Sequence, residues 1–543
     1  MFVQITKSKR GDKSYLTYLV RESFRTPKGP RSRTVCNITA LPPETRELIA
    51  ESLKGNAFVA AESGRIEQAL DYGGLAVLVD AWERFGMDRI FGWIESPRQR
   101  GLLKAMIFAR LLFPCAKLAL VQRAEGTVLR EACGLEPSED FDEDDLYAAM
   151  DRLTGHWVET EQILHREAFS EKVRLVLYDL TGTYFEGKAP EHLGEYGHSR
   201  DHRGDRPQII LAAAADVNGV PLHVSVLRGN RADTTTLKGL LEKLRRRFGI
   251  GEATFVFDGG MSSQLNLEAL EADELAYVTR QSNATLSALI KELPEDRQLE
   301  LDDRTNLIEL EYEGKRYVIA GGHRRQQRDR ERRQARLAKA EKALKELAGR
   351  KRKKVDPRKL ASQAGRLLQR LKAHKYFEYR VEEQRLHWRR IEQVISDEEH
   401  VDGWYLLRTN LSSEQSAPSD VLANYKSLPG VEEAFRDLKT YLEVRPVYHW
   451  RPDRVVNHVR LCFIAYWLNA RLAQEWQDKG VREEVSRTLR RLQTIRLGRL
   501  RVLGKKAPSA ITPIPPELNE LLIKIDRLRL FAAPPKWAEH QPS

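Results

Sequence analysis

The chain has 543 residues, too many for one ordinary hydrophobic core, so we expect several structural units. Lys and Arg outnumber Asp and Glu by 90 to 78, and the net charge of +12 favours a polyanionic partner. The apolar runs are too short for a membrane span, and the first residues lack a signal-peptide pattern. The four cysteines are scattered without C-x2-C spacing, which argues against a disulfide framework or a zinc ribbon. These features predict a cytoplasmic protein with no membrane partner.

Residues 1–170 contain two regions of different pattern. Residues 1–45 are basic, and apolar residues alternate at 15–20 and 34–38, as in a small β-hairpin. Residues 46–170 have helical periodicity, with an apolar-faced helix at 101–113 and a helix at 139–153 that begins with acids. We expect a small β-like unit followed by a helical adaptor region.

An α/β pattern begins near residue 171. Short β-like runs occur at 174–180, 208–216, 220–227, 253–258 and 275–280, with a helical segment between the third and the fourth. The pattern resumes with a strand at 402–410 and helices at about 418–443 and 453–476. This order predicts an α/β domain, made of 171–280 and 401–476, in which helices flank a mixed sheet.

Residues 281–400 interrupt that domain, and we interpret them as an insertion of polar strands followed by a basic helical hairpin. Between Gly321 and Lys375 there are 21 basic and 5 acidic residues, a net charge of +16. Apolar residues recur every three or four positions on both sides of Pro357, which predicts two helices joined at a basic tip. The segment is either a solvated surface or a binding site for phosphates, and its one-sided charge favours phosphates. The tail, 477–543, is expected to pack loosely around one helix at about 516–530.

Two aspartates follow apolar runs of the predicted sheet. Asp179 ends the run VLYDL, and Asp258 ends FVFD before two glycines. Open α/β sheets bind their ligands at the carboxyl ends of the strands, so both acids are candidates for a site at that edge. The alternative for either residue alone is a turn or cap aspartate.

A third carboxylate is predicted on a helix. In VEEAFRDLKTYLEV the apolar residues Val431, Phe435, Leu438 and Leu442 form the buried stripe. Glu432, Arg436 and Lys439 follow the same spacing one position later, about 100° around the helix. An ordinary surface pair between Glu432 and Arg436 would give the same local pattern.

Three converging carboxylates repel one another unless cations neutralise them. Oxygen ligands of this kind suit Mg²⁺ or Mn²⁺ rather than zinc. Two such ions can activate a hydroxyl and stabilise the leaving oxygen in attack on a phosphodiester. The residues therefore favour metal-assisted phosphoryl transfer on nucleic acid, with Asp179, Asp258 and Glu432 as ligands.

The order strand Asp, strand Asp, helix Glu, with a long insertion before the Glu, resembles the ribonuclease H-like catalytic domain of DDE transposases from bacterial insertion sequences. The branch with a Y-x2-R-x3-E-x6-K signature is the most similar, because Tyr425, Glu432 and Lys439 stand at its spacing. Leu428 occupies the arginine position, and Arg436 is a candidate for a similar charge. The motifs YDLTGTYFEG, GHSRDHRGDRPQI, LRGNRADTTTL and FVFDGGMSS match as well, and the resemblance covers about 170–475.

The resemblance implies an enzyme that cleaves DNA at the ends of its own element and joins them to target DNA. It implies metal binding by Asp179, Asp258 and Glu432, with two Mg²⁺ or Mn²⁺ ions, and DNA contacts by Tyr425 and Lys439. Further DNA contacts are expected from one more set of basic residues: Arg324, Arg325, Lys351, Arg352, Lys353, Lys354 and Arg436. The expected partners are double-stranded DNA, as terminal inverted repeats and as target, and a second copy of the chain in the complex that pairs two ends.

Three other functions are compatible with parts of this pattern. A nuclease without strand transfer would have the same fold and metals, and a DNA-binding protein without catalysis would lack one acid of the triad, although none is missing here. A glycosidase with paired carboxylates has no obvious use for the basic hairpin. For a transposase we expect DNA binding by the helical region 46–170 and a location at the bacterial nucleoid.

Overall fold

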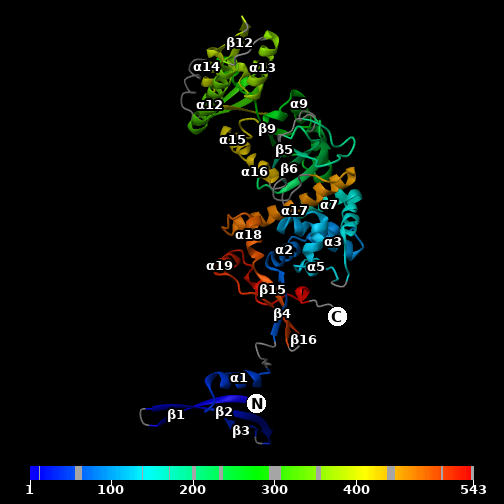
Figure 1. Cartoon of the computed structure of the whole chain (residues 1–543), viewed down its shortest axis with the longest axis vertical. Helices are drawn as coiled ribbons and strands as arrows, with labels where there is room; N and C mark the ends of the chain where they lie inside the picture. Colours follow the sequence, from blue (N-terminus) through cyan, green and yellow to red (C-terminus); the bar gives the residue numbers. More distant parts are fainter. Residues whose placement is uncertain are drawn as a thin grey trace.

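The computed structural model of the chain describes residues 1–10, 13–27, 29–55, 64–136, 139–169, 172–197, 203–231, 237–292, 307–349, 356–383, 385–436, 447–502 and 505–539. The side chains of residues 10, 13, 64, 238, 432–435 and 505 lie outside this description. The molecule is elongated (Figure 1). The C-terminal elements lie beside the helices formed by the first third of the chain (Figure 1).

An N-terminal unit stands at one end of the molecule (Figure 1). Strands β1 (Phe2–Arg10), β2 (Lys13–Thr26) and β3 (Gly29–Asn37) form an antiparallel sheet in the order β1-β2-β3, and helix α1 (Pro43–Leu53) follows. The predicted hairpin is present as β2 and β3, and β1 adds a third strand. The polar residues that alternate along β1 gave only a weak strand pattern in the sequence.

A helical region contains the largest core of the described residues. Its main helices are α2 (Gly73–Arg84), α3 (Pro97–Leu112), α4 (Lys117–Ala124), α6 (Glu143–Asp151), α7 (Leu153–Ala168) and α17 (Pro452–Asp478). Helix α17 comes from the second half of the chain and packs against α3, α6 and α7. No single described helix is long and apolar enough to cross a membrane; only α3 and α4 taken together pass that test, across a bend of 92°.

The tail packs more tightly than we expected. Strands β15 (Arg496–Val502) and β16 (Lys505–Ile511) form a sheet with β4 (Gly64–Asp71), and Leu497 and Leu522 are fully buried in the helical core. Gly73 explains how close the contact is, because a Cβ atom there would lie 2.2 Å from the carbonyl oxygen of Leu492. Helix α19 (Pro516–Lys524) matches the helix predicted in the tail.

An eight-stranded mixed sheet forms the centre of the α/β domain, in the order β10-β11-β14-β9-β8-β5-β6-β7. Strands β5, β8 and β9 are parallel, and each remaining neighbour pair is antiparallel. The predicted strands appear as β5 (Leu175–Tyr184), β6 (Gln208–Ala215), β7 (Pro221–Arg228), β8 (Thr254–Phe257), β9 (Ala276–Arg280) and β14 (Tyr405–Thr409). This arrangement is the predicted ribonuclease H-like sheet.

The sheet differs from the expected one in two respects. Strands β10 (Leu307–Tyr312) and β11 (Lys315–Ala320) extend the sheet, so the sheet continues beyond the expected boundary at residue 281. Asp179 does not end its strand either, because β5 continues to Tyr184 while pairing with β6.

Helices cover both faces of this sheet. Helices α8 (Leu237–Phe248) and α9 (Gln264–Ala272) pack on one face. Helices α15 (Pro418–Lys426), α16 (Pro429–Arg436) and α17 pack on the other. The helix predicted at 418–443 is therefore interrupted before Pro429, a residue that fits the first turn of a new helix.

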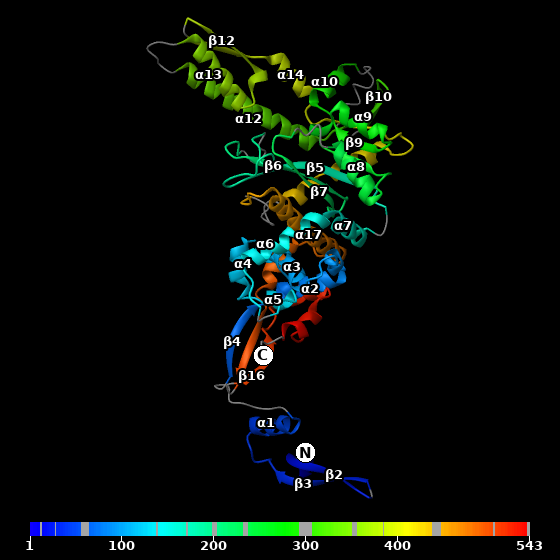
Figure 2. The same cartoon turned by 90° about the vertical axis from the view of Figure 1, so that its right-hand side faces the viewer.

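The predicted basic hairpin is formed by α12 (His323–Ala348) and α13 (Pro357–Arg370), which project from the sheet (Figure 2). Leu337, Leu344, Leu360 and Leu368 are buried between these helices and the small sheet of β12 (Phe377–Glu382) and β13 (Arg385–Arg390). The periodic leucines in the sequence therefore mark the inner face of the hairpin.

Candidate active site

Asp179 and Asp258 lie at the same level on neighbouring parallel strands. The register of β5 and β8 pairs Tyr178 with Phe257, and the two aspartates are the next residue on each chain. Strand β8 ends at Phe257, so β5 loses one neighbour at the level of Asp179. The two carboxylates therefore flank the point where the sheet opens, which is where open α/β sheets bind ligands.

The two aspartates face the same side of the sheet. Tyr178 and Phe257 are buried under α8 and α9, while Leu177 and Val256 belong to the core under α16 and α17. Side chains alternate along a strand, and Asp258 has an extended backbone, so Asp179 and Asp258 share the side of α16. Both carboxylates thus face the helix that contains Glu432.

The surroundings of each aspartate differ from those of a cap residue. Asp258 is exposed and precedes the short 3₁₀ turn Gly259–Met261, but its side chain makes no cap hydrogen bond to that turn. Asp179 is half-buried, and its Oδ1 accepts a hydrogen bond of 2.7 Å from the backbone N–H of Leu180. Asp258 therefore does not act as a cap residue for the turn that follows it.

A close backbone contact sets the position of the Asp258 turn. A Cβ atom on Gly259 would lie 2.8 Å from the carbonyl oxygen of Arg280, the last residue of β9. Glycine at 259 lets the turn pack directly against the end of the neighbouring strand. As a result, Arg280 and Asp258 are brought to the same end of the sheet.

Glu432 lies in α16, which packs on β5 and β6. Val431 is fully buried in the core beneath that helix, as the predicted apolar stripe requires. The side chain of Glu432 and all of residues 437–446, including Lys439, lie outside the described residues. Within the described part, no cluster of three or more His, Cys, Asp or Glu side chains is suited to hold a metal ion.

Tyr425, at the end of α15, is adjacent to Asp258 and to two arginines. Burial, and next the negative charge of Asp258, raise the pKa of Tyr425 to about 12, while Arg280 and Arg325 act in the opposite direction. The Tyr425 ring lies 5.9 Å from the ring of Tyr405, and the Arg325 guanidinium carbon lies 4.8 Å above the Tyr405 ring. These side chains connect Asp258 to the start of α12.

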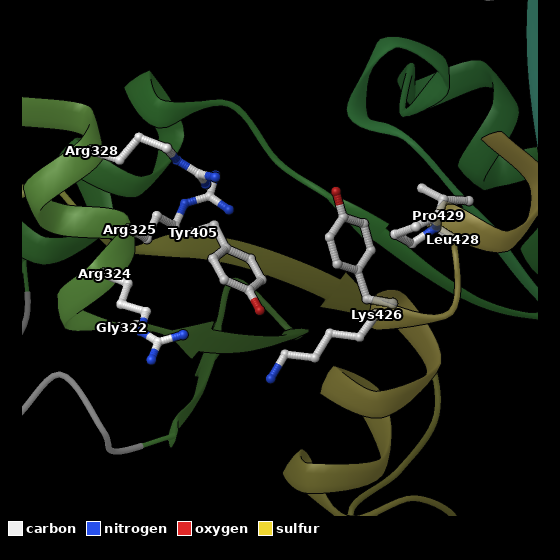
Figure 3. Close-up of a pocket in the computed structure, with 10 residues that line it drawn as sticks. Gly322, Arg324, Arg325, Arg328, Tyr405, Lys426, Leu428 and Pro429 are labelled. Carbon is white, nitrogen blue, oxygen red and sulfur yellow. The ribbon is translucent and has the colours of Figure 1, made fainter. Parts of the chain in front are cut away.

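A cationic pocket of about 440 Å³ opens beside Tyr425. Figure 3 shows Arg324, Arg325 and Arg328 extending from α12 toward Tyr405, and Lys426 reaching toward them from α15. The residues that line it are Gly321, Gly322, Arg324, Arg325, Arg328, Tyr405, Tyr425, Lys426, Leu428 and Pro429, with no acid among them. The Nε atom of Arg325 is buried and has no hydrogen-bond partner among the described residues. Such a lining suits an anion.

The predicted basic residues have different positions. Arg324 and Arg325 line the pocket together with Tyr425. Leu428, at the arginine position of the signature, is only 4% exposed and belongs to the core. Arg436 is exposed at the end of α16 and does not line the pocket. The two arginines whose charges lower the pKa of Tyr425 are Arg280 and Arg325. The set Lys351, Arg352, Lys353 and Lys354 lies outside the described residues.

Sequence reasoning missed Arg280, Arg328, Tyr405 and Lys426. Arg280 ends a core strand next to that of Asp258, so the pattern that identified the aspartates could have identified it. Tyr405 and Arg328 carry no such signal. They join the site only because β14 pairs with β9 and because α12 begins at the end of β11.

The sequence model of a family described as “Transposase DDE domain” matches residues 177–468, more than half of the chain. The chain belongs to the DDE transposase family. The match includes Asp179, Asp258 and the helix of Glu432. Proteins of this family act on DNA by phosphoryl transfer.

The other comparisons add little to this assignment. Among solved structures, the chain is similar to the piggyBac transposase in a synaptic complex with hairpin DNA, with a TM-score of 0.38 and 8% sequence identity. That similarity covers 77% of each chain. Curated protein sequences give no match.

Proposed function

We propose that this DDE transposase moves a bacterial insertion sequence by cleaving DNA at the ends of its own element and joining them to target DNA. The observation that carries the proposal is the pair Asp179 and Asp258, at one level of two parallel strands and facing the helix of Glu432. The acids and the family match also fit a nuclease that lacks the joining step.

Asp179, Asp258 and Glu432 would hold two Mg²⁺ or Mn²⁺ ions. The carboxylate donors fit hard divalent cations, and two like charges on adjacent strands favour a cation between them. Such ions activate a hydroxyl and stabilise the leaving oxygen of a phosphodiester. The two aspartates lie on neighbouring strands, and Asp258 is exposed just after the end of β8.

The cationic pocket would hold backbone phosphates of the DNA strand at the acids. Four basic side chains line it and no carboxylate does, while Asp329, one turn further along α12, lies 3.7 Å from the Arg325 Nε and offsets part of that charge. Tyr425 lines the pocket and is close enough to Asp258 for that charge to act on its pKa. Phosphate contacts of this kind position a duplex without reading its sequence. Lys439, Arg436 and the Lys351–Lys354 tip would extend the same contacts. Pairing of two element ends would require at least two copies of the chain.

The test uses DNA that flanks the coding region, where we expect inverted repeats. A labelled duplex with one repeat is incubated with Mg²⁺, a supercoiled target plasmid and either the wild-type chain or Asp179→Asn. We expect the wild type to cleave at the repeat and to form a covalent product with the plasmid, and the variant to bind the duplex without cleaving it. Cleavage by Asp179→Asn at the wild-type rate would show that Asp179 is not a metal ligand of the active site. Cleavage without joining would indicate the nuclease.

A further inference from the structure

The N-terminal sheet has two faces of different chemistry. Helix α1 covers one of them, since the guanidinium carbon of Arg46 lies 4.1 Å above the ring of Tyr18. Val3, Ile5 and Tyr18 line a pocket together with residues of α1. Because side chains alternate, odd residues of β1 and even residues of β2 up to Val20 face the helix. This covered face is mainly apolar.

The opposite face is polar and carries no carboxylate among its described residues. The strand registers place on it Gln4, Thr6, Ser8, Thr17, Arg21, Ser23, Arg25, Ser32, Thr34 and Asn37, together with the apolar or aromatic residues Phe2, Tyr15, Leu19 and Pro30. A hydrogen bond of 2.5 Å from Arg21 to Gln4 agrees with this assignment. The acid of the described sheet, Glu22, pairs with Arg33 at 2.8 Å on the side of α1.

The side chains of this face suit base edges better than phosphates alone. Hydroxyl and amide groups both donate and accept hydrogen bonds, and arginine reads guanine, as recognition in the major groove requires. The surrounding charge is favourable as well, because residues 1–45 contain nine basic and three acidic residues.

The size and position of the sheet allow this contact. Two neighbouring strands at a spacing of about 4.8 Å form a ribbon of the kind that the major groove, about 12 Å wide, admits. The unit stands at one end of the molecule, and the described parts of the chain leave its polar face uncovered (Figures 1 and 2).

We propose that the face with Gln4, Thr17, Arg25 and Thr34 enters the major groove and reads the base sequence of duplex DNA at the ends of the element. This inference rests on the proposed function for the identity of the DNA. It assigns sequence recognition to the N-terminal sheet and leaves the helical region as the connection to the catalytic domain.

The test compares full-length variants of one hairpin. Arg25→Ala and Thr34→Val change exposed residues of the polar face, and Arg31→Ala is the matched control on the other face of the same hairpin. Dissociation constants are measured at one salt concentration for a duplex with the flanking inverted repeat and for a duplex of permuted sequence. We expect the first two variants to lose about ten-fold or more of the preference for the repeat. Arg31→Ala should keep the preference.

A second measurement locates the groove. Replacing guanine by 7-deazaguanine in the repeat removes a major-groove acceptor, and it should weaken wild-type binding but not binding by Arg25→Ala. An unchanged preference in both face variants would overturn the proposal, and so would an equal loss of preference in Arg31→Ala. Unchanged binding to the permuted duplex shows that a variant is folded.

The outcome separates this inference from the proposed function. If face variants keep their preference while Asp179→Asn abolishes cleavage, the recognition surface is wrong and the transposase stands. If the wild type binds the repeat through this face but never cleaves it, recognition stands and the proposed chemistry fails.

Discussion

Lys117 is a buried cation outside the active site, at the first position of α4 and only 7% exposed. Its ammonium nitrogen lies 4.7 Å above the Tyr147 ring. Burial, and next the charge of Arg110, lower the pKa of Lys117 to about 7; Arg454 lowers it further, while Cys462 and Asp151 act in the opposite direction. The unfolded chain therefore binds one more proton than the folded chain between about pH 7 and pH 10.5.

This shift predicts that the protein becomes more stable as the pH rises through that window. Lys117→Met should raise the free energy of unfolding at pH 7 or below by up to roughly 5 kcal/mol, because one pKa unit corresponds to about 1.36 kcal/mol. The gain should shrink as the pH approaches 10.5. Denaturant unfolding at pH 6.5 and pH 9.5 measures it, with Lys524→Met on the exposed side of α19 as the control. A gain that is the same at both pH values would contradict the assigned cause.

The Nε atom of Arg325 is buried without a hydrogen-bond partner among the described residues, and the nearest carboxylate, that of Asp329, lies 3.7 Å away. Burial, and next the charge of Arg280, lower the pKa of Arg325, while Asp329 and Tyr405 act in the opposite direction. If a DNA phosphate lies there, Arg325→Ala should weaken binding to all duplexes by a similar factor and reduce the salt slope by about one. Titrations at several salt concentrations test this. The exposed Arg482, outside the pocket, serves as the control, and an unchanged slope for Arg325→Ala would exclude the contact.

Residues at strand ends could be predicted from sequence, whereas residues joined by tertiary pairing could not. Asp258 follows a short apolar run and precedes a pair of glycines, a local pattern that can be recognised in the sequence alone. Arg328 and Tyr405 reach the same site through α12 and β14, about 70 and about 150 residues later in the chain than β8. Their local sequence has no feature that distinguishes them from core or surface residues.

At the scale of elements, one buried ion pair fixes the basic hairpin to the catalytic sheet. Arg333 of α12 is 5% exposed, and its guanidinium donates to Asp402 Oδ1 at 2.7 Å, just before β14. Glu399 lies 3.2 Å from the same guanidinium. The pair therefore sets the position of the arginines at the start of α12 relative to Tyr405.

Removing Asp402 should leave the buried Arg333 with the half-exposed Glu399 as its remaining carboxylate partner among the described residues. Asp402→Ala is expected to destabilise the attachment of α12 by about 3–5 kcal/mol and to weaken DNA binding through the displaced pocket arginines. Hydrogen exchange of α12 amides measures the first effect. Glu378→Ala breaks the exposed pair with Arg389 between strands β12 and β13, which pack on the hairpin, and should cost less than about 1 kcal/mol. Equal protection of α12 in both variants would show that the Arg333 pair does not hold the hairpin.

The elements with clear periodicity were predictable, and those with mixed patterns were not. Apolar runs such as QIILAAAA gave the central strands, and leucines at helical spacing gave both helices of the hairpin. LIELEY and KRYVIA were expected as polar strands of the insertion, and their membership of the large sheet depends on the pairing of β11 with β14. The strand of Asp179 likewise extends beyond the apolar run because β6 continues to pair with it.

At the scale of the whole molecule, segments distant in sequence form each functional part. The tail completes the core of the helical region through β15 and α19, although its prolines suggested loose packing. The +16 segment of the sequence becomes a hairpin whose first turn lines the pocket next to Asp258. The N-terminal sheet and this pocket lie in different parts of the elongated molecule (Figure 1). Recognition and cleavage of DNA are therefore expected to be separable by mutation.

We propose that Asp179, Asp258 and Glu432 hold the metal ions that cleave DNA. The most direct measurement is the rate of cleavage of the repeat duplex by Asp258→Cys in Mg²⁺ and in Mn²⁺, with the wild type in both metals. A thiolate is a poor ligand for Mg²⁺ and a better one for Mn²⁺. We predict loss of cleavage in Mg²⁺, recovery by at least about ten-fold in Mn²⁺, and unchanged DNA binding. Cleavage by Asp258→Cys in Mg²⁺ at the wild-type rate would contradict the account.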